Sequence, residues 1–221
     1  MKHLATYSLF ESKENPWDLP DNPFRVALGK ELHHAVYDTQ EGKDLLAVAS
    51  FRFRTRDEST GVFTSLVVAL DDFRFVIVEP QRRIPEGPLV WSFGIYPYDN
   101  PGPPYIPGGD FPTIGKCLRA LWIRIVTMLC DEIFLDAYER QRHVDLIGDN
   151  LEILAGHEYS LADLRFLIPH LKRIATGDIS GMDHATAARL REKYPDVWKV
   201  ILDKNDPDSL GTLADLGDLG F

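Results

Sequence analysis

The chain has 221 residues, of which 44% are hydrophobic and 26% are charged, so it can bury a substantial core without disulfides or a structural metal. Its formal net charge of −10 argues against non-specific binding to nucleic acid, because a phosphate backbone attracts clustered lysine and arginine. Charged residues interrupt the one long apolar run, residues 118–135, and the first eleven residues lack the apolar core of a signal peptide, so we expect a cytoplasmic protein without a membrane span.

The first 98 residues predict an antiparallel sheet of four or five strands. Apolar and polar residues alternate in two segments, as in half-buried strands, and β-branched residues dominate a third. Two tight links separate these three segments, which favours a meander in which each strand pairs with the next. One further strand is expected at the edge of the sheet, and another just before a proline-rich region. The expected strands are 33–37, 45–54, 62–70, 73–78 and 90–96.

Six prolines and three glycines lie between residues 97 and 112. Proline fixes φ and lacks an N–H donor, so this composition excludes both a helix and a central strand. We interpret residues 99–112 as a stiff connector between the sheet and the helical half of the chain. The aromatic residues in and beside it predict that it packs against its own sheet.

Residues 113–202 predict a bundle of four or five helices. Apolar residues recur at helical spacing from Ile114, and one long helix is expected to run to about His143. Pro169 should kink a later helix, and Gly177 should end it. The other expected helices cover 144–154, 161–176, 183–194 and 196–202. With the sheet, these helices predict an α+β fold, built as one compact unit or as two packed subdomains.

Two cysteines, Cys117 and Cys130, lie on the predicted long helix. Their separation of 13 residues corresponds to roughly 20 Å of helix, which is beyond the reach of a disulfide. We interpret them as small apolar packing residues. The sequence contains no Gly-x-Ser-x-Gly, Cys-x-x-Cys or His-Glu-x-x-His motif, so nucleophilic and zinc chemistry have no sequence support, and we expect no cofactor.

The predicted long helix continues its apolar face with four side chains that could act as ligands, Glu132, Asp136, Glu139 and His143. On one straight helix these side chains would converge, so they could serve a metal-assisted hydrolase in which Asp136, Glu139 and His143 hold the metal. The alternative is a solvated ladder of ion pairs, such as Asp136 with Arg140 at i, i+4. We favour the ladder because charged surface stripes are common on helices.

Three further features indicate binding. Arg52, Arg54 and Arg74 predict a basic comb on the sheet, which could receive an acidic partner, the chain's own tail, or only water. Residues 203–221 form an acidic tail that could dock into a basic apolar groove. Its candidate contact residues are Asp206, Asp208, Asp215, Asp218 and Phe221. Residues 160–194 resemble a DNA-binding helix-turn-helix in outline, but an ordinary helical hairpin fits an acidic chain better.

The combined pattern favours a non-catalytic acidic interaction protein, such as an adaptor, an inhibitor or an immunity-type protein. Its expected partner is another protein, with basic character, rather than nucleic acid or a membrane. A metal-assisted hydrolase and a DNA-binding regulator remain the two alternatives.

Overall fold

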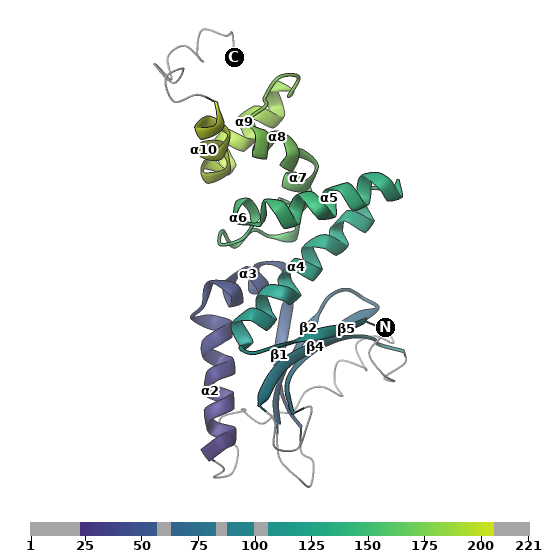
Figure 1. Cartoon of the computed structure of the whole chain (residues 1–221), viewed down its shortest axis with the longest axis vertical. Helices are drawn as coiled ribbons and strands as arrows, with labels where there is room; N and C mark the ends of the chain where they lie inside the picture. The colour runs from purple at the N-terminus through teal and green to yellow at the C-terminus, as the bar shows by residue number, and fades with distance from the viewer. Residues whose placement is uncertain (1–22, 57–62, 83–87, 100–105, 206–221) are drawn as a thin grey trace. The chain divides into compact units, whose positions relative to one another are not determined.

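The computed structural model describes residues 23–56, 63–82, 88–99 and 106–205. Within these ranges, two helices are followed by a five-stranded antiparallel sheet and then by a series of helices (Figure 1). This order confirms the predicted α+β class. The chain divides into two compact units: the first contains Met1–Val126 and Gly156–Ser160, and the second contains Thr127–Ala155 and Leu161–Phe221.

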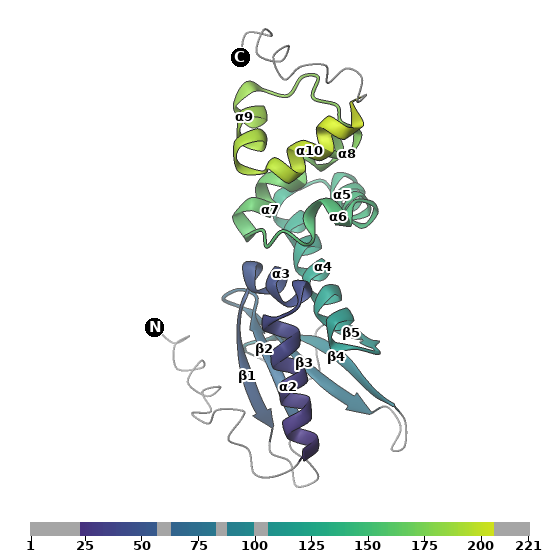
Figure 2. The same ribbon diagram turned by 90° about the vertical axis from the view of Figure 1, so that its left-hand side faces the viewer.

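The first described elements are the helices α2 (Pro23–Tyr37) and α3 (Gln40–Val48). The prediction of an edge strand at 33–37 was therefore wrong, as was the start of a strand at Leu45. Leu28, Leu32 and Val36 are buried at the i, i+4, i+8 spacing of a helix, and α2 packs across β2 (Figure 2).

Thr39 separates the two helices. Its hydroxyl donates to the backbone oxygen of Ala35 at 2.5 Å and accepts from the backbone N–H of Gly42 at 3.2 Å. The side chain therefore bonds to the last turn of α2 and caps the first turn of α3. This local bonding places α3 in a stretch whose alternating pattern predicts a strand.

The sheet follows the order β1-β2-β3-β4-β5, with every neighbouring pair antiparallel, so the predicted meander is confirmed. Alternate residues on one face are fully buried and form the core of the first unit. These are Leu66, Val68, Val76, Val78 and Ile95. The strands are β1 (Ser50–Arg56), β2 (Phe63–Ala69), β3 (Arg74–Arg82), β4 (Leu89–Pro97) and β5 (Ile106–Phe111).

Strand β5 lies within the region predicted to be a connector. Proline excludes a central strand, and β5 is indeed the edge of the described sheet, where it pairs with β4. A Cβ atom at Gly108 would lie 2.4 Å from the backbone oxygen of Phe93, so the close approach of β5 to β4 requires glycine there. Part of the predicted connector is thus a strand. Its prolines confine that strand to the edge of the sheet, and Gly108 allows its backbone to approach β4.

The predicted long helix is two helices, α4 (Ile114–Ile133) and α5 (Ala137–Asp149). The prediction of continuity to His143 was wrong because Asp136 caps a new helix. Its carboxylate accepts hydrogen bonds from the backbone N–H groups of Tyr138 at 3.0 Å and Glu139 at 2.9 Å. A short helix, α6 (Leu151–Leu154), comes next.

The elements described between residues 161 and 205 are helices, and their kink and stop agree with prediction. Pro169 lies in a single 3₁₀ turn (Ile168–His170), and Gly177 ends α8 with φ of 72°. The core is formed by apolar residues of these helices, including Leu164, Leu171 and Ile201. The elements are α7 (Leu161–Leu167), α8 (Leu171–Thr176), α9 (His184–Lys193) and α10 (Pro195–Lys204). Across the described ranges, no helix is both long enough and apolar enough to cross a membrane.

Both cysteines are buried in α4. Burial raises the pKa of Cys117 to about 12, and burial with the nearby Asp131 charge raises the pKa of Cys130 to about 11. We expect both thiols of the native protein to resist a disulfide reagent such as Ellman's reagent at pH 8, and both to react at once in guanidinium chloride. Rapid labelling of the native protein would contradict this placement.

Candidate interaction site

The four candidate ligands on the predicted long helix do not form one site. Glu132 lies at the end of α4 and pairs with Arg165, whose Nη2 lies 2.8 Å from Oε2. Asp136 serves as the cap of α5. The imidazole of His143 stacks on Phe134, with ring centroids 3.8 Å apart, and its Nδ1 lies 2.8 Å from the backbone oxygen of Glu139.

The helix break explains this dispersal. Residues on either side of it no longer share one helical face, and Glu132 and Asp136 are both exposed. The described residues contain no group of three or more histidine, cysteine, aspartate or glutamate side chains placed to hold a metal ion. Of the predicted ladder, Glu139 pairs with Arg142 at 3.3 Å, whereas Arg140 pairs with Asp131 at 3.4 Å and Asp136 serves as the helix cap.

The predicted basic comb is also divided. Arg52 and Arg54 are two positions apart on β1 and so belong to the same face of the sheet. Arg52 is opposite Val67 in the strand register, and Val67 is opposite Ile77, so this face also includes the position of Ile77. Arg74 is three positions before Ile77 on β3 and therefore belongs to the other face. The strand register therefore does not bring Arg74 to the other two arginines. The candidate contact residues of the acidic tail, Asp206, Asp208, Asp215, Asp218 and Phe221, lie outside the described residues.

Two of the three lysine and arginine side chains of α9 contact residues of the helical hairpin itself. The guanidinium of Arg189 lies over the ring of Phe166 at 3.9 Å, and the ammonium of Lys193 pairs with Asp163. The hydroxyl of Tyr194 donates to the same carboxylate at 2.8 Å. These contacts are what an ordinary helical hairpin needs for its own packing.

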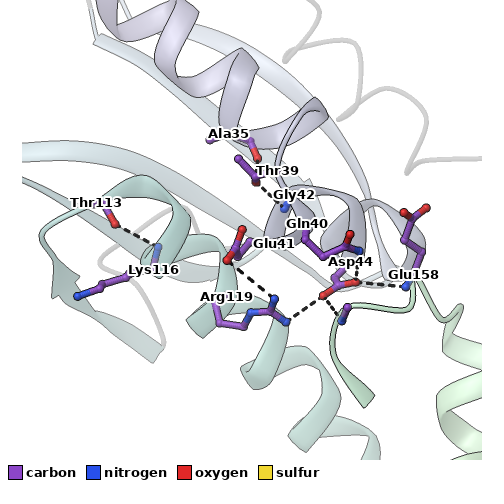
Figure 3. A network of polar contacts seen from close by, with 11 residues as sticks. Ala35, Thr39, Gln40, Glu41, Gly42, Asp44, Thr113, Lys116, Arg119 and Glu158 are labelled. Atoms are coloured by element: carbon purple, nitrogen blue, oxygen red, sulfur yellow. Dashed lines mark hydrogen bonds and ion pairs between the residues drawn. The ribbon is translucent and has the colours of Figure 1, made fainter. Parts of the chain in front are cut away.

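Among the described residues of the first unit, the most buried acidic side chain is that of Asp44, on α3 (Figure 3). One carboxylate oxygen accepts from Arg119 Nη1 at 2.9 Å and from the backbone N–H of Gly156 at 2.8 Å. The other accepts from Gln40 at 3.1 Å and from the backbone N–H of Glu158 at 3.2 Å. Both oxygens are thus occupied by donors from the chain itself.

The Asp44 cluster has a structural role, because it links separate segments of the chain. It ties α3 to α4 and to the segment 156–160, where Gly156 and Glu158 both have positive φ, of 87° and 54°. A carboxylate already engaged by four donors is poorly placed to accept a substrate proton. The sequence does offer one signal for this cluster: Arg119 interrupts an otherwise apolar helical face, and a charge in such a position needs a partner.

The turn between β2 and β3 carries the feature that points to binding. Asp71 accepts from the backbone N–H groups of Phe73 at 2.8 Å and Arg74 at 2.7 Å, and from Arg74 Nε at 2.8 Å. The backbone N–H of Tyr98 also donates to the Phe73 oxygen at 2.9 Å. These bonds hold the turn, yet the Phe73 side chain is 71% exposed. The sequence pattern instead predicts Phe73 in a strand, on the same face as Phe75.

Electrostatics at this turn are dominated by the pair of Asp71 and Arg74. Partial burial raises the pKa of Asp71, but the hydrogen bond from Arg74, those from the turn backbone and the Arg74 charge outweigh it, so the net shift is downward. The carboxylate is thereby kept ionised, and it neutralises the charge of Arg74, whose Nη2 lies 2.6 Å from Asp71 Oδ2.

A hollow of about 430 Å³ lies beside Phe73. We call this feature the Phe73 hollow. Four of its lining residues are apolar or aromatic, namely Phe73, Ile95, Pro97 and Tyr98. The charged lining residues are Asp72, Arg74 and Asp99. Since Asp71 neutralises Arg74, the charge that remains around the hollow is acidic.

Comparison of the chain with protein-family models, with curated proteins and with solved structures gave no match. Function is therefore inferred from the geometry of the chain itself.

Proposed function

We propose that this protein is a non-catalytic acidic interaction protein that binds a basic protein partner through the Phe73 hollow. One observation carries the proposal: a phenylalanine held by a hydrogen-bonded turn is 71% exposed beside an apolar hollow. A large aromatic side chain left in water gains free energy when a partner covers it. A turn that is already ordered also loses little conformational entropy on binding.

The charge around the hollow supports a partner with basic character. Asp72 and Asp99 are exposed, and the one arginine that lines the hollow is neutralised by Asp71. The net charge of −10 adds a long-range attraction to the same class of partner. Association should therefore slow as salt is added. A cytoplasmic location belongs to this proposal as well, and it is supported by the two buried free thiols.

The partner can be identified by photo-crosslinking in the native source. A benzophenone amino acid in place of Phe73 should give a discrete adduct with one protein, because that side chain would lie in the interface. The matched control carries the same group in place of Lys116, which is exposed in the same unit. Equal adducts from both positions would contradict the proposal.

Removal of the aromatic ring tests the energetic role of this site. Once the crosslinked partner has been identified and purified, Phe73→Ala should weaken the affinity of the chain for that partner. The expected loss is about 2 kcal/mol, or roughly 30-fold, as for a central aromatic contact. Titration calorimetry would measure the change, with Lys116→Ala as the control that should stay close to wild type. Unchanged affinity for Phe73→Ala would overturn the proposal.

The class of interaction protein is decided by the partner's behaviour. If the partner is an enzyme and loses activity in the complex, the chain acts as an inhibitor or an immunity-type protein. If the partner keeps its activity, the chain acts as an adaptor.

A further inference from the structure

Among the described residues of the second unit, the most exposed large apolar side chains lie at the turn from α4 to α5. Leu135 is 94% exposed and Tyr138 is 75% exposed. The backbone here is held firmly, because Asp136 caps α5 and the guanidinium of Arg140 donates to the backbone oxygen of Leu135 at 3.4 Å. The turn thus presents two apolar side chains from a fixed backbone.

A hollow of about 350 Å³ runs along α5 from this turn. Tyr138, Gln141, Asp145 and Asp149 line it at the spacing of one helical stripe, and Arg142 and Leu146 complete its lining. Eleven residues of helix separate the ends of the stripe, which corresponds to roughly 16 Å. A second helix laid along α5 would contact the whole stripe and both exposed apolar side chains.

The charge of this surface selects the partner. Each arginine is matched by one carboxylate: Arg140 by Asp131 at 3.4 Å, Arg142 by Glu139 at 3.3 Å and Arg165 by Glu132 at 2.8 Å. Three carboxylates remain that form no ion pair with another described residue. These are Asp136, Asp145 and Asp149. The surface is therefore apolar at one end and acidic along its length.

We propose that this surface, the α5 corner (Leu135, Tyr138, Asp145 and Asp149), binds a basic amphipathic helix of another protein. The apolar side chains of that helix would cover Leu135 and Tyr138, and its lysines or arginines would face Asp145 and Asp149. The α5 corner shares no residue with the Phe73 hollow and belongs to the other unit, so this binding is separate from the function proposed above.

A synthetic helix tests the α5 corner while the natural partner is still unidentified. The probe is a fluorescent leucine–lysine amphipathic peptide of 13 residues, the length of α5, and binding to the full chain is followed by fluorescence anisotropy. The wild-type chain should bind it, with an affinity that falls as salt rises. The same peptide with glutamate in place of lysine should not bind.

Two double variants distinguish specific binding at the α5 corner from general electrostatic attraction between the basic peptide and the acidic chain. Leu135→Ser with Tyr138→Ser keeps every charge and should weaken the peptide about tenfold. Asp145→Asn with Asp149→Asn should weaken it roughly fivefold and flatten the salt dependence. Lys116→Ala, an exposed substitution in the other unit, is the control and should leave peptide affinity close to wild type. All five substituted side chains are exposed, and circular dichroism would verify that each variant is folded.

Three outcomes would overturn the inference. One is no binding of the lysine peptide to the wild-type chain. The second is equal binding by the Leu135→Ser, Tyr138→Ser variant, since that would show general electrostatic attraction alone. The third is a dimer in sedimentation equilibrium that the same variant abolishes, because the occupant would then be a second copy of the chain.

Discussion

Replacement of Asp44 by alanine is expected to lower the free energy of unfolding by about 3–5 kcal/mol, as for a buried ion pair that loses one partner. The carboxylate is 1% exposed and accepts four hydrogen bonds. Without it, Arg119 and the backbone N–H groups of Gly156 and Glu158 lose their acceptor inside the protein. Urea denaturation followed by circular dichroism would measure the loss.

Two further variants show whether the loss arises at the carboxylate. Glu41 lies 4.0 Å from Arg119 and its side chain is 37% exposed, so Glu41→Gln should change stability by less than about 0.5 kcal/mol. Arg119→Met combined with Asp44→Ala should cost less than the sum of the single variants, because both remove the same interaction. Full additivity would show that the two side chains do not stabilise each other.

Among the eight glycines whose surroundings the structure describes, Gly42 is expected to tolerate alanine least, with a loss of at least about 2 kcal/mol. A Cβ atom at this position would lie 2.1 Å from the backbone oxygen of Val36 and 2.2 Å from that of Ala35. Both atoms belong to the backbone of α2, so neither can rotate away. Helix α3 would have to move from α2, and the Thr39 cap at Gly42 would be disturbed.

Gly148→Ala provides a matched control for Gly42→Ala. Gly148 also lies in a helix, but a Cβ atom there would meet no heavy atom within 4 Å. Alanine should therefore stabilise the protein by about 0.5–1 kcal/mol, since it restricts the unfolded chain and favours helix. Thermal unfolding of the two variants would compare them directly. A stable Gly42→Ala protein would contradict the close approach of α2 and α3.

The two proposed binding surfaces share a physical design. In each, a side-chain carboxylate orders a turn by accepting backbone N–H groups, Asp71 beside Phe73 and Asp136 beside Tyr138. Large apolar side chains are then left in water at fixed positions, with acidic groups close by. An acidic interaction protein needs this combination, because apolar contact supplies affinity and charge selects a basic partner.

Local sequence pattern was sufficient for much of the fold. Strand alternation and tight links predicted the meander, since cross-strand pairing of neighbours depends on short-range features. Pro169 and Gly177 marked a kink and a helix end because their backbone preferences act within one turn. Helices α2 and α3 were missed where alternation over a few residues imitated a strand, although apolar residues at 28, 32 and 36 carry a helical period.

The candidate sites depended on contacts that no local pattern contains. Asp44 receives donors from residues 75, 112 and 114 positions away, so its role appears only when α3, α4 and the segment after Ala155 come together. Phe73 has the pattern of an inward strand residue, and only the turn built by Asp71 leaves it exposed.

Composition and periodicity determined the α+β class, the order of strands β1 to β4 and the acidic character of this protein, because each is a property of the chain or of neighbouring residues. Tertiary structure decided which polar groups are buried, where the predicted long helix breaks, and which apolar side chains remain in water. These outcomes depend on competition among distant partners for the same hydrogen bonds and the same core, and that competition is resolved only when the whole chain is folded.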